Sequence, residues 1–256
     1  MDNSSHVASE LPLSPYYPLG VAVPGYVAND MTTLTILSYF AVGCGSILLA
    51  ACFISRRVRP SLSTGELLTV MWFVLSGSIH LGMEGMSHIR SLPFPPPILT
   101  LHNHIGYVVY HSAAIGSMQT VLGQAWKEYS HSDSRYLTQD PFVITMEGIT
   151  AVFWGPLCLV IAYCILADHP MRHPLQTIVS LGQIYGDVLY YLTCWFDHSV
   201  REIVYCRPEN FYFWGYFILL NAFWIVIPFH LMTTSMRETS RAFDMLKVMV
   251  DGKKMA

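Results

Sequence analysis

The sequence predicts an all-α polytopic membrane protein, a five-transmembrane-helix bundle with a ligand pocket inside the membrane. Of its 256 residues, 53% are hydrophobic and 12% are charged, against about 25% charged in a soluble domain, and the mean hydropathy is +0.41. The apolar residues form separate blocks of about 20 or more, the length a helix needs to cross about 30 Å of hydrocarbon. Barrel strands would instead alternate over about ten residues. A single helical membrane domain follows from this pattern.

The elements follow one another along the chain as five apolar blocks joined by polar segments. Residues 1–30 are a proline-rich entry without Lys or Arg, so they lack the basic start of a cleavable signal peptide. A mixed segment, 89–140, connects the second span to the third, and a polar tail covers 237–256. Within that segment, 105–125 is apolar enough for a sixth span, but its polar residues and glycines favour an interfacial or re-entrant helix. The expected spans are residues 31–54, 67–86, 142–167, 174–196 and 211–233.

The basic residues predict the orientation of the bundle. Nine of the 14 Lys and Arg lie in the first loop, in the loop after the third span and in the tail. Because cytoplasmic loops carry the excess of Lys and Arg, we expect a cytoplasmic C-terminus and a lumenal N-terminus. The glycosylation sequon at Asn3 would then face the lumen.

Polar side chains recur at helical spacing inside the predicted spans. Residues three or four apart share one face of a helix. Taken singly, a histidine or asparagine in a span is read as a packing residue that hydrogen-bonds across helices. Together they indicate one buried pocket. The candidate catalytic residues are His80, Glu84, Glu147, Thr150, Asn221 and Trp224, and the candidate ligand-pocket residues are Tyr185, Asp187, Tyr190 and Trp154.

The two glutamates Glu84 and Glu147 have no Lys or Arg inside any span to compensate them. Such carboxylates indicate either proton transfer or a cationic ligand. Isomerisation of an alkene, or its cyclisation, by protonation needs an acid, a base and surroundings that tolerate a carbocation. A carboxyl group in an apolar site can stay protonated, while a second carboxylate and an aromatic ring face offer negative potential to the cation.

Other classes of function lack their sequence signals. The chain has no Walker or dinucleotide-binding glycine motif, no nucleophile elbow and no zincin spacing, so we expect no cofactor. No metal site is expected, because His102, His104 and His111 have no flanking carboxylate and are interpreted as surface residues. The six cysteines show no paired spacing typical of zinc sites or disulfide frameworks. A net charge of -3 without a basic stripe excludes nucleic acid as a partner.

At these residues the chain resembles the emopamil-binding protein family, sterol delta-8, delta-7 isomerases of the endoplasmic reticulum. The resemblance covers about Pro15 to Pro228. It departs between Gly85 and Trp126, where the connection between the second and third spans is unusually long. The matching stretches are Ile79-His80 with Glu84-Gly85, Trp126 to Tyr129 with Asp133 to Tyr136, Glu147 to Thr150, Gln183 to Tyr190, and Asn221 with Trp224.

The resemblance implies a sterol pocket that opens to the membrane. It places His80 and Glu84 in the proton relay and sets Glu147, Asn221 and Trp224 against the cation, without fixing which group is acid and which is base. Around the pocket mouth, we expect an ion-pair network that closes the pocket from the lumenal side. This network would comprise Asp133, Arg135 and Glu128.

Three functions remain open from the sequence. The first is an isomerase of the intramolecular oxidoreductase type that shifts a sterol ring double bond in the endoplasmic reticulum membrane. The second is the same carbocation chemistry on another isoprenoid, as a terpenoid isomerase or cyclase. The third is a non-catalytic receptor for sterols or cationic amphiphiles. The expected partners are a sterol or other isoprenoid and membrane lipid, with a homodimer left open.

Overall fold

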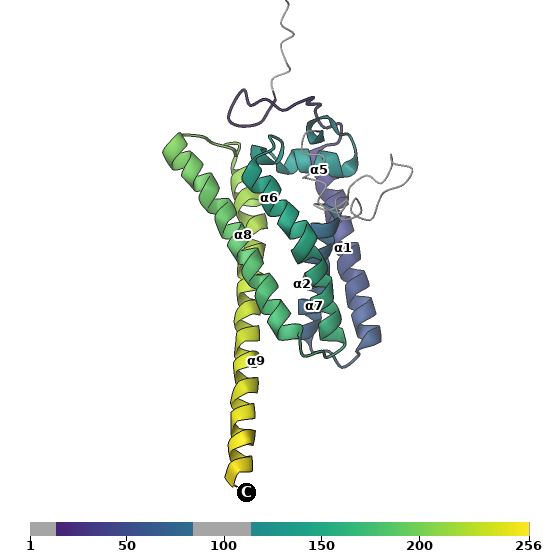
Figure 1. Cartoon of the computed structure of the whole chain (residues 1–256). Helices are drawn as coiled ribbons and strands as arrows, with labels where there is room; N and C mark the ends of the chain where they lie inside the picture. The colour runs from purple at the N-terminus through teal and green to yellow at the C-terminus, as the bar shows by residue number, and fades with distance from the viewer. Residues whose placement is uncertain (1–13, 84–113, 256) are drawn as a thin grey trace, which may run out of the picture.

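Within residues 14–83 and 114–255, which the computed structural model describes, every regular element is a helix (Figure 1). The all-α class is therefore confirmed. Two stretches, Thr150–Trp154 and Phe211–Leu220, are π-helical. The elements are α1 (Thr33–Val58), α2 (Thr64–Gly82), η1 (Ile115–Ser117), α5 (Val121–Tyr129), η2 (Ser134–Tyr136), α6 (Pro141–Ile149), η3 (Thr150–Trp154), α7 (Gly155–Leu166), α8 (Arg172–Arg201), η4 (Phe211–Leu220) and α9 (Asn221–Met255).

Four of the described helical stretches are long and apolar enough to cross a membrane: α1, α2, the unit α6–η3–α7 and the unit η4–α9. Helix α8 has 30 residues, or about 45 Å of length, and packs along α9 and α7. It is long enough to cross a membrane but is not among the four apolar stretches. Its role as the fifth span therefore stays a prediction.

The helix boundaries follow from local capping chemistry. Ser63 and Glu66 form a capping box at the start of α2, so this helix begins three residues before the expected span. Asp140 accepts hydrogen bonds from the amides of Phe142 and Val143, and Pro141 occupies the first turn of α6. At the other end of the chain, the expected polar tail continues α9 as helix to Met255 and projects beyond the bundle (Figure 1). Residues 84–86 of the expected second span lie outside the described residues.

Helices α2 and α7 approach closely because glycines face each other between them. A Cβ atom on Gly77 would lie 3.1 Å from the backbone oxygen of Gly155, and one on Gly155 would lie 3.2 Å from the Cβ of His80. Small residues at such contacts let two helix backbones come together. The contact fixes the position of His80 relative to the third predicted span.

Helix α5 lies across one end of the bundle, where it forms a cap with η1 and η2 (Figure 1). The described part of the 105–125 segment, residues 114–125, consists of η1 and the start of α5 and does not cross the bundle. Lys127 is fully buried in the cap and donates a hydrogen bond to the Val27 carbonyl at 2.7 Å. Tyr16 donates to the Lys127 carbonyl at 2.9 Å. These bonds attach the proline-rich entry to the cap.

A buried ion pair lies in the cap, and its arginine also binds α8. Arg135 and Asp133 are 1% and 0% exposed, and their closest N–O distance is 2.7 Å. The guanidinium also donates to the Thr193 hydroxyl at 2.8 Å and lies over the ring of Tyr190. The third member of the expected network is elsewhere: Glu128 accepts a hydrogen bond from Tyr216 and lines the cavity described below. The ion pair is thus confirmed, and the inclusion of Glu128 in it is wrong.

The cap should be sensitive to acid through His131. Its ring stacks on Tyr16 with centroids 4.8 Å apart. Burial, reinforced by the nearby Arg207 charge and opposed by Glu209, lowers the pKa of His131 to about 4. In the unfolded chain, His131 binds a proton below about pH 6.5, whereas in the folded protein it stays neutral down to about pH 4. The free energy of unfolding therefore decreases as the pH falls from about 6.5 to about 4.

We expect the melting temperature in detergent to fall between pH 7 and pH 5. In a His131→Phe variant, which keeps a ring to stack on Tyr16 and cannot be protonated, this decrease should be smaller. An unchanged decrease in the variant would assign the acid sensitivity to other groups.

Candidate active site

A cavity of about 500 Å³ lies inside the bundle beneath the cap. Its size falls in the range of ligand-binding pockets, about 300–1,000 Å³. Helices α1, α2, α5, α6, α8 and α9 all contribute side chains to its wall, which is mainly apolar. The cavity is therefore formed by segments far apart in the sequence. Polar lining residues are Cys44, His80, Glu128, Tyr129, Tyr136, Glu147, Thr150, Gln183, Asp187, Tyr190, Tyr216 and Asn221.

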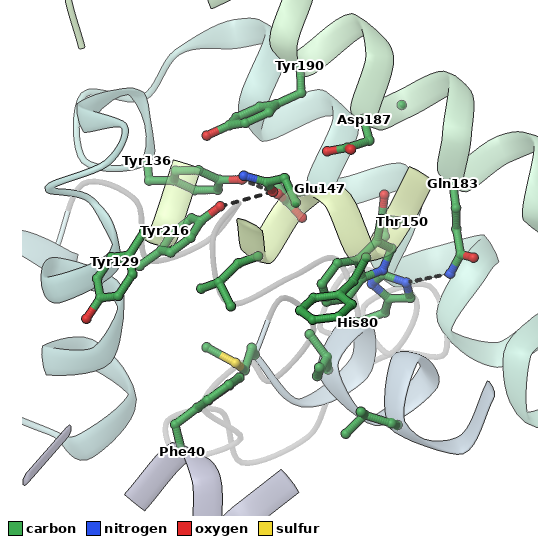
Figure 2. A pocket seen from close by; sticks show the side chains of 18 of the residues that line it. Phe40, His80, Tyr129, Tyr136, Glu147, Thr150, Gln183, Asp187, Tyr190 and Tyr216 are labelled. Carbon is green, nitrogen blue, oxygen red and sulfur yellow. Dashed lines mark hydrogen bonds between the residues drawn. The ribbon is translucent and has the colours of Figure 1, made fainter. Parts of the chain in front are cut away.

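Glu147 lies at the centre of the cavity wall (Figure 2). It is 7% exposed, and one of its carboxyl oxygens accepts a 2.8 Å hydrogen bond from the Tyr136 hydroxyl. Burial, followed by the Glu147 charge, raises the pKa of Tyr136 well above its usual value. The tyrosine therefore stays protonated and donates to Glu147. One helical turn after Glu147, Thr150 donates to the Met146 carbonyl at 2.8 Å where the helix becomes π-helical.

His80 reaches the cavity from α2 and meets α8 there. Its imidazole Nε2 lies 3.3 Å from the amide nitrogen of Gln183, and the residue is 3% exposed. Such a bond fixes which imidazole nitrogen carries the proton and how the ring is oriented. The ring of Trp224 is 6.3 Å from the His80 ring, centroid to centroid, at 56°. An imidazole and an indole face thus border the same space.

The η4–α9 helix supplies the remaining wall. The Asn221 side-chain oxygen accepts a 3.2 Å hydrogen bond from the Tyr129 hydroxyl, and its amide nitrogen donates to the Phe217 carbonyl at 2.8 Å. Trp224 packs against Trp72 with centroids 5.7 Å apart. The face of an aromatic ring attracts a cation, and the attraction is stronger when the cation is desolvated, as it would be in this apolar cavity.

Eight of the ten residues expected at the site line this cavity. Tyr185 does not: its side chain is 65% exposed and points away, so its inclusion in the pocket is wrong. On α8 the residues that line the cavity are 182, 183, 186, 187 and 190, and position 185 falls on another side of the helix. Glu84 lies outside the described residues. The residues brought together are His80, Glu147, Thr150, Trp154, Asp187, Tyr190, Asn221 and Trp224.

This arrangement combines a carboxyl group, an imidazole and aromatic faces around an apolar space. It can donate a proton to a bound hydrocarbon, accept one from it and stabilise a positive charge between the two steps. Among the described residues, no group of three or more histidine, cysteine or acidic side chains could hold a metal ion.

Comparison with known proteins agrees with this geometry. Over 240 residues the chain is 37% identical to the rat protein named 3-beta-hydroxysteroid-Delta(8),Delta(7)-isomerase, covering 92% of this chain and 93% of that protein. The chain belongs to the emopamil-binding protein family. A family model described as EXPERA, the expanded EBP superfamily, matches residues 121–235, which include α5 and most of the cavity wall.

Plant members of the family are more distant. A rice protein named probable 3-beta-hydroxysteroid-Delta(8),Delta(7)-isomerase is 33% identical over 91% of this chain and 95% of its own length. The protoglabretal synthase of Citrus sinensis is 26% identical over 81% of this chain and 86% of its own length.

Several polar groups that line the cavity were not predicted from the sequence. Tyr129 and Tyr136 come from the cap, outside the apolar spans in which polar site residues are expected. Gln183 was noted in its span but not placed beside His80. Glu128 and Tyr216 hydrogen-bond each other at 3.3 Å on the cavity wall. Burial raises the pKa of Glu128, while hydrogen bonds from Thr33 and Tyr216 oppose the rise. For Glu128, Tyr129 and Tyr136, the available signal was the pair of matching stretches Trp126 to Tyr129 and Asp133 to Tyr136.

The shape of the cavity depends on Gly182, where α8 meets the indole of Trp154. A Cβ atom there would lie 2.4 Å from the Trp154 ring. We expect Gly182→Ala to push Trp154 into the cavity, to weaken ligand binding about 10-fold or more, and to destabilise the protein by about 1–3 kcal/mol through overpacking. Binding and melting temperature should be compared with Gly186→Ala, where the nearest atom to a new Cβ is 3.9 Å away. Equal effects of both variants would contradict this account.

Proposed function

We propose that this protein is a sterol isomerase that moves a ring double bond from the delta-8 to the delta-7 position. Proton addition to C9 of the delta-8 alkene places a positive charge on C8, and loss of a proton from C7 forms the delta-7 bond. Protons and electrons balance, so the reaction needs no oxidant and no cofactor. The observation that carries the proposal is 37% identity to the rat delta-8, delta-7 isomerase over 92% of the chain.

The cavity supports the chemistry. Glu147 accepts a hydrogen bond from Tyr136 at the cavity wall, and His80 faces the same space from α2. We assign proton donation and removal to Glu147 and His80 together with Glu84, which follows His80 by four positions in the sequence and lies outside the described residues. Because interacting acid and base groups titrate as a unit, we assign the roles to the set and not to single members.

Cation stabilisation is assigned to Trp224, Asn221 and Thr150. The indole face of Trp224 offers its quadrupole to the charge at C8. The Asn221 amide is oriented by Tyr129 and by a backbone carbonyl, so it needs no reorganisation when the charge develops. The apolar remainder of the wall excludes water, which would otherwise capture the cation as an alcohol.

We further propose that the protein resides in the endoplasmic reticulum membrane with α8 as a fifth span and the C-terminus in the cytoplasm. The distribution of Lys and Arg supports this orientation. Glycosylation of Asn3 in microsomes would agree with it. Modification of a sequon added after Ala256, in place of Asn3, would contradict it.

The test is to supply membranes containing the protein with a delta-8 sterol and to follow the product by gas chromatography with mass spectrometry. We expect a delta-7 sterol of unchanged mass. Turnover of an epoxidised or linear terpenoid in its place would favour the terpenoid alternative, which rests on the resemblance to the Citrus sinensis protoglabretal synthase. Tight binding of the sterol without any product would favour a receptor.

A further inference from the structure

Asp187 is a polar residue of the cavity wall for which the proposed chemistry has no use. It projects from α8 toward the same space as Glu147 (Figure 2). Its Oδ2 atom is buried and has no hydrogen-bond partner among the described residues. Most buried polar atoms in folded proteins are hydrogen-bonded, and an unsatisfied one costs about 1–3 kcal/mol. An unsatisfied oxygen that faces a ligand cavity therefore indicates a donor group on the ligand.

The cavity is polar on one side and apolar on the other. From α1, the wall receives Ile36, Leu37 and Phe40, and from the first two turns of α9 it receives Phe223 and Ile227. Phe40 and Phe223 are 38% and 45% exposed on the outside of the bundle, where lipid would surround them. In Figure 2, Asp187 and Phe40 lie on opposite sides of the cavity. A ligand with one polar end would place that end at α8 and its hydrocarbon toward α1 and the membrane.

Helix α8 also sets the distance between Asp187 and the reacting groups. Gln183 holds His80, and Asp187 is four residues further along α8, which corresponds to about 6 Å along the helix axis. In a sterol, a 3-hydroxyl oxygen is six bonds from C8, and with bonds of about 1.5 Å the two atoms are about 6–7 Å apart across two fused rings. An alkene placed at His80 would bring the hydroxyl to the level of Asp187.

We propose that Asp187 recognises the 3β-hydroxyl of the substrate by accepting its hydrogen bond. This inference rests on the proposed sterol isomerase function and names the residue that sets the orientation of the ring system in the cavity. A carboxyl oxygen accepts such a bond whether or not the group is ionised. Asp187 is a specificity-determining residue: it selects hydroxylated over hydroxyl-free hydrocarbons and aligns C9 and C7 with the acid and base groups.

A role for Asp187 in proton transfer would give different results. Asp187→Asn keeps an acceptor oxygen but cannot carry a proton, so hydroxyl recognition predicts that this variant still prefers a hydroxylated over a hydroxyl-free ligand. A proton-relay role predicts that this variant loses kcat as strongly as the glutamate variants. Asp187→Leu removes both properties.

The decisive experiment compares a 3β-hydroxy delta-8 sterol with its 3-deoxy analogue on purified protein in nanodiscs, measuring the Kd of each ligand and the kcat/KM of each. A hydrogen bond of this kind corresponds to about 10–100-fold in affinity, which we expect the unmodified protein to show as a preference for the hydroxylated ligand. In Asp187→Leu, the preference should disappear because binding of the hydroxylated sterol weakens, while binding of the deoxy analogue stays the same.

Asp197→Asn is the matched control. It removes another buried carboxyl group of α8, one that is satisfied by Tyr205 and Arg201 outside the cavity, and it should leave the preference intact. Equal weakening of both ligands in Asp187→Leu would overturn the inference, as would the absence of a preference in the unmodified protein. Because Kd is measured apart from turnover, a protein that binds with this preference but forms no delta-7 product would refute the isomerase function alone.

Discussion

Replacement of Glu147 by Gln should lower kcat for delta-8 sterol isomerisation by about 10²–10⁴-fold, the range typical for loss of a general acid or base. The amide has the size of the carboxyl group and can still accept the 2.8 Å hydrogen bond from Tyr136, so the fold and the cavity should be retained. What is lost is the ability to exchange a proton and the negative charge beside the cation. Turnover should be measured in membranes together with the melting temperature.

A control variant and a variant of the residue that orients Glu147 test the same role. Glu238→Gln changes an exposed glutamate of α9 that pairs with Arg241, and it should leave turnover unchanged. Tyr136→Phe should lower kcat about 10-fold, because the carboxyl group remains but is no longer oriented by the cap. Full activity of Glu147→Gln with an intact fold would remove this residue from the proton chemistry.

Replacement of Arg135 by Met should destabilise the protein by about 3–5 kcal/mol, because it leaves the Asp133 carboxylate buried without its partner. Both side chains are at most 1% exposed, so water cannot replace the lost interaction. The same guanidinium connects the cap to α8 through Thr193. Urea unfolding in a mild detergent, followed by intrinsic fluorescence, measures the change in free energy of unfolding.

The matched control is Arg241→Met, which breaks the exposed pair with Glu238 and should change stability by about 0–1 kcal/mol. The double variant Asp133→Asn with Arg135→Met should be less destabilised than the sum of the two single variants, because it leaves no unpaired charge. Additive effects would show that the two residues do not act as a pair in the folded protein.

Much of the site could be predicted because a membrane restricts where polar residues are tolerated. Glu147 and Asn221 are conspicuous in apolar blocks, and helical spacing places Thr150 and Trp224 on the same faces as these residues. Helical spacing also explains why the expectation that Tyr185 lines the pocket was wrong. Positions 183, 187 and 190 share a face of α8, and position 185 lies on a different face.

The cap could not be predicted in the same way. Its residues Tyr129 and Tyr136 lie in a mixed segment where no periodicity relates them to the spans. Their contacts with Asn221 and Glu147 join residues 92 and 11 positions apart, and such contacts depend on how α5 lies across the bundle. Glu128 was assigned to an ion-pair network on the strength of its charge alone, whereas packing places it opposite Tyr216.

In the proposed reaction, the cavity protonates a sterol alkene at C9 and removes a proton from C7. Turnover of a delta-8 sterol in deuterated water, with the product analysed by mass spectrometry and NMR, tests both steps. We expect a delta-7 sterol that carries one deuterium, located at C9, and much slower formation of this product by the Glu147→Gln variant. A delta-7 product without deuterium at C9 would contradict protonation from an exchangeable acid.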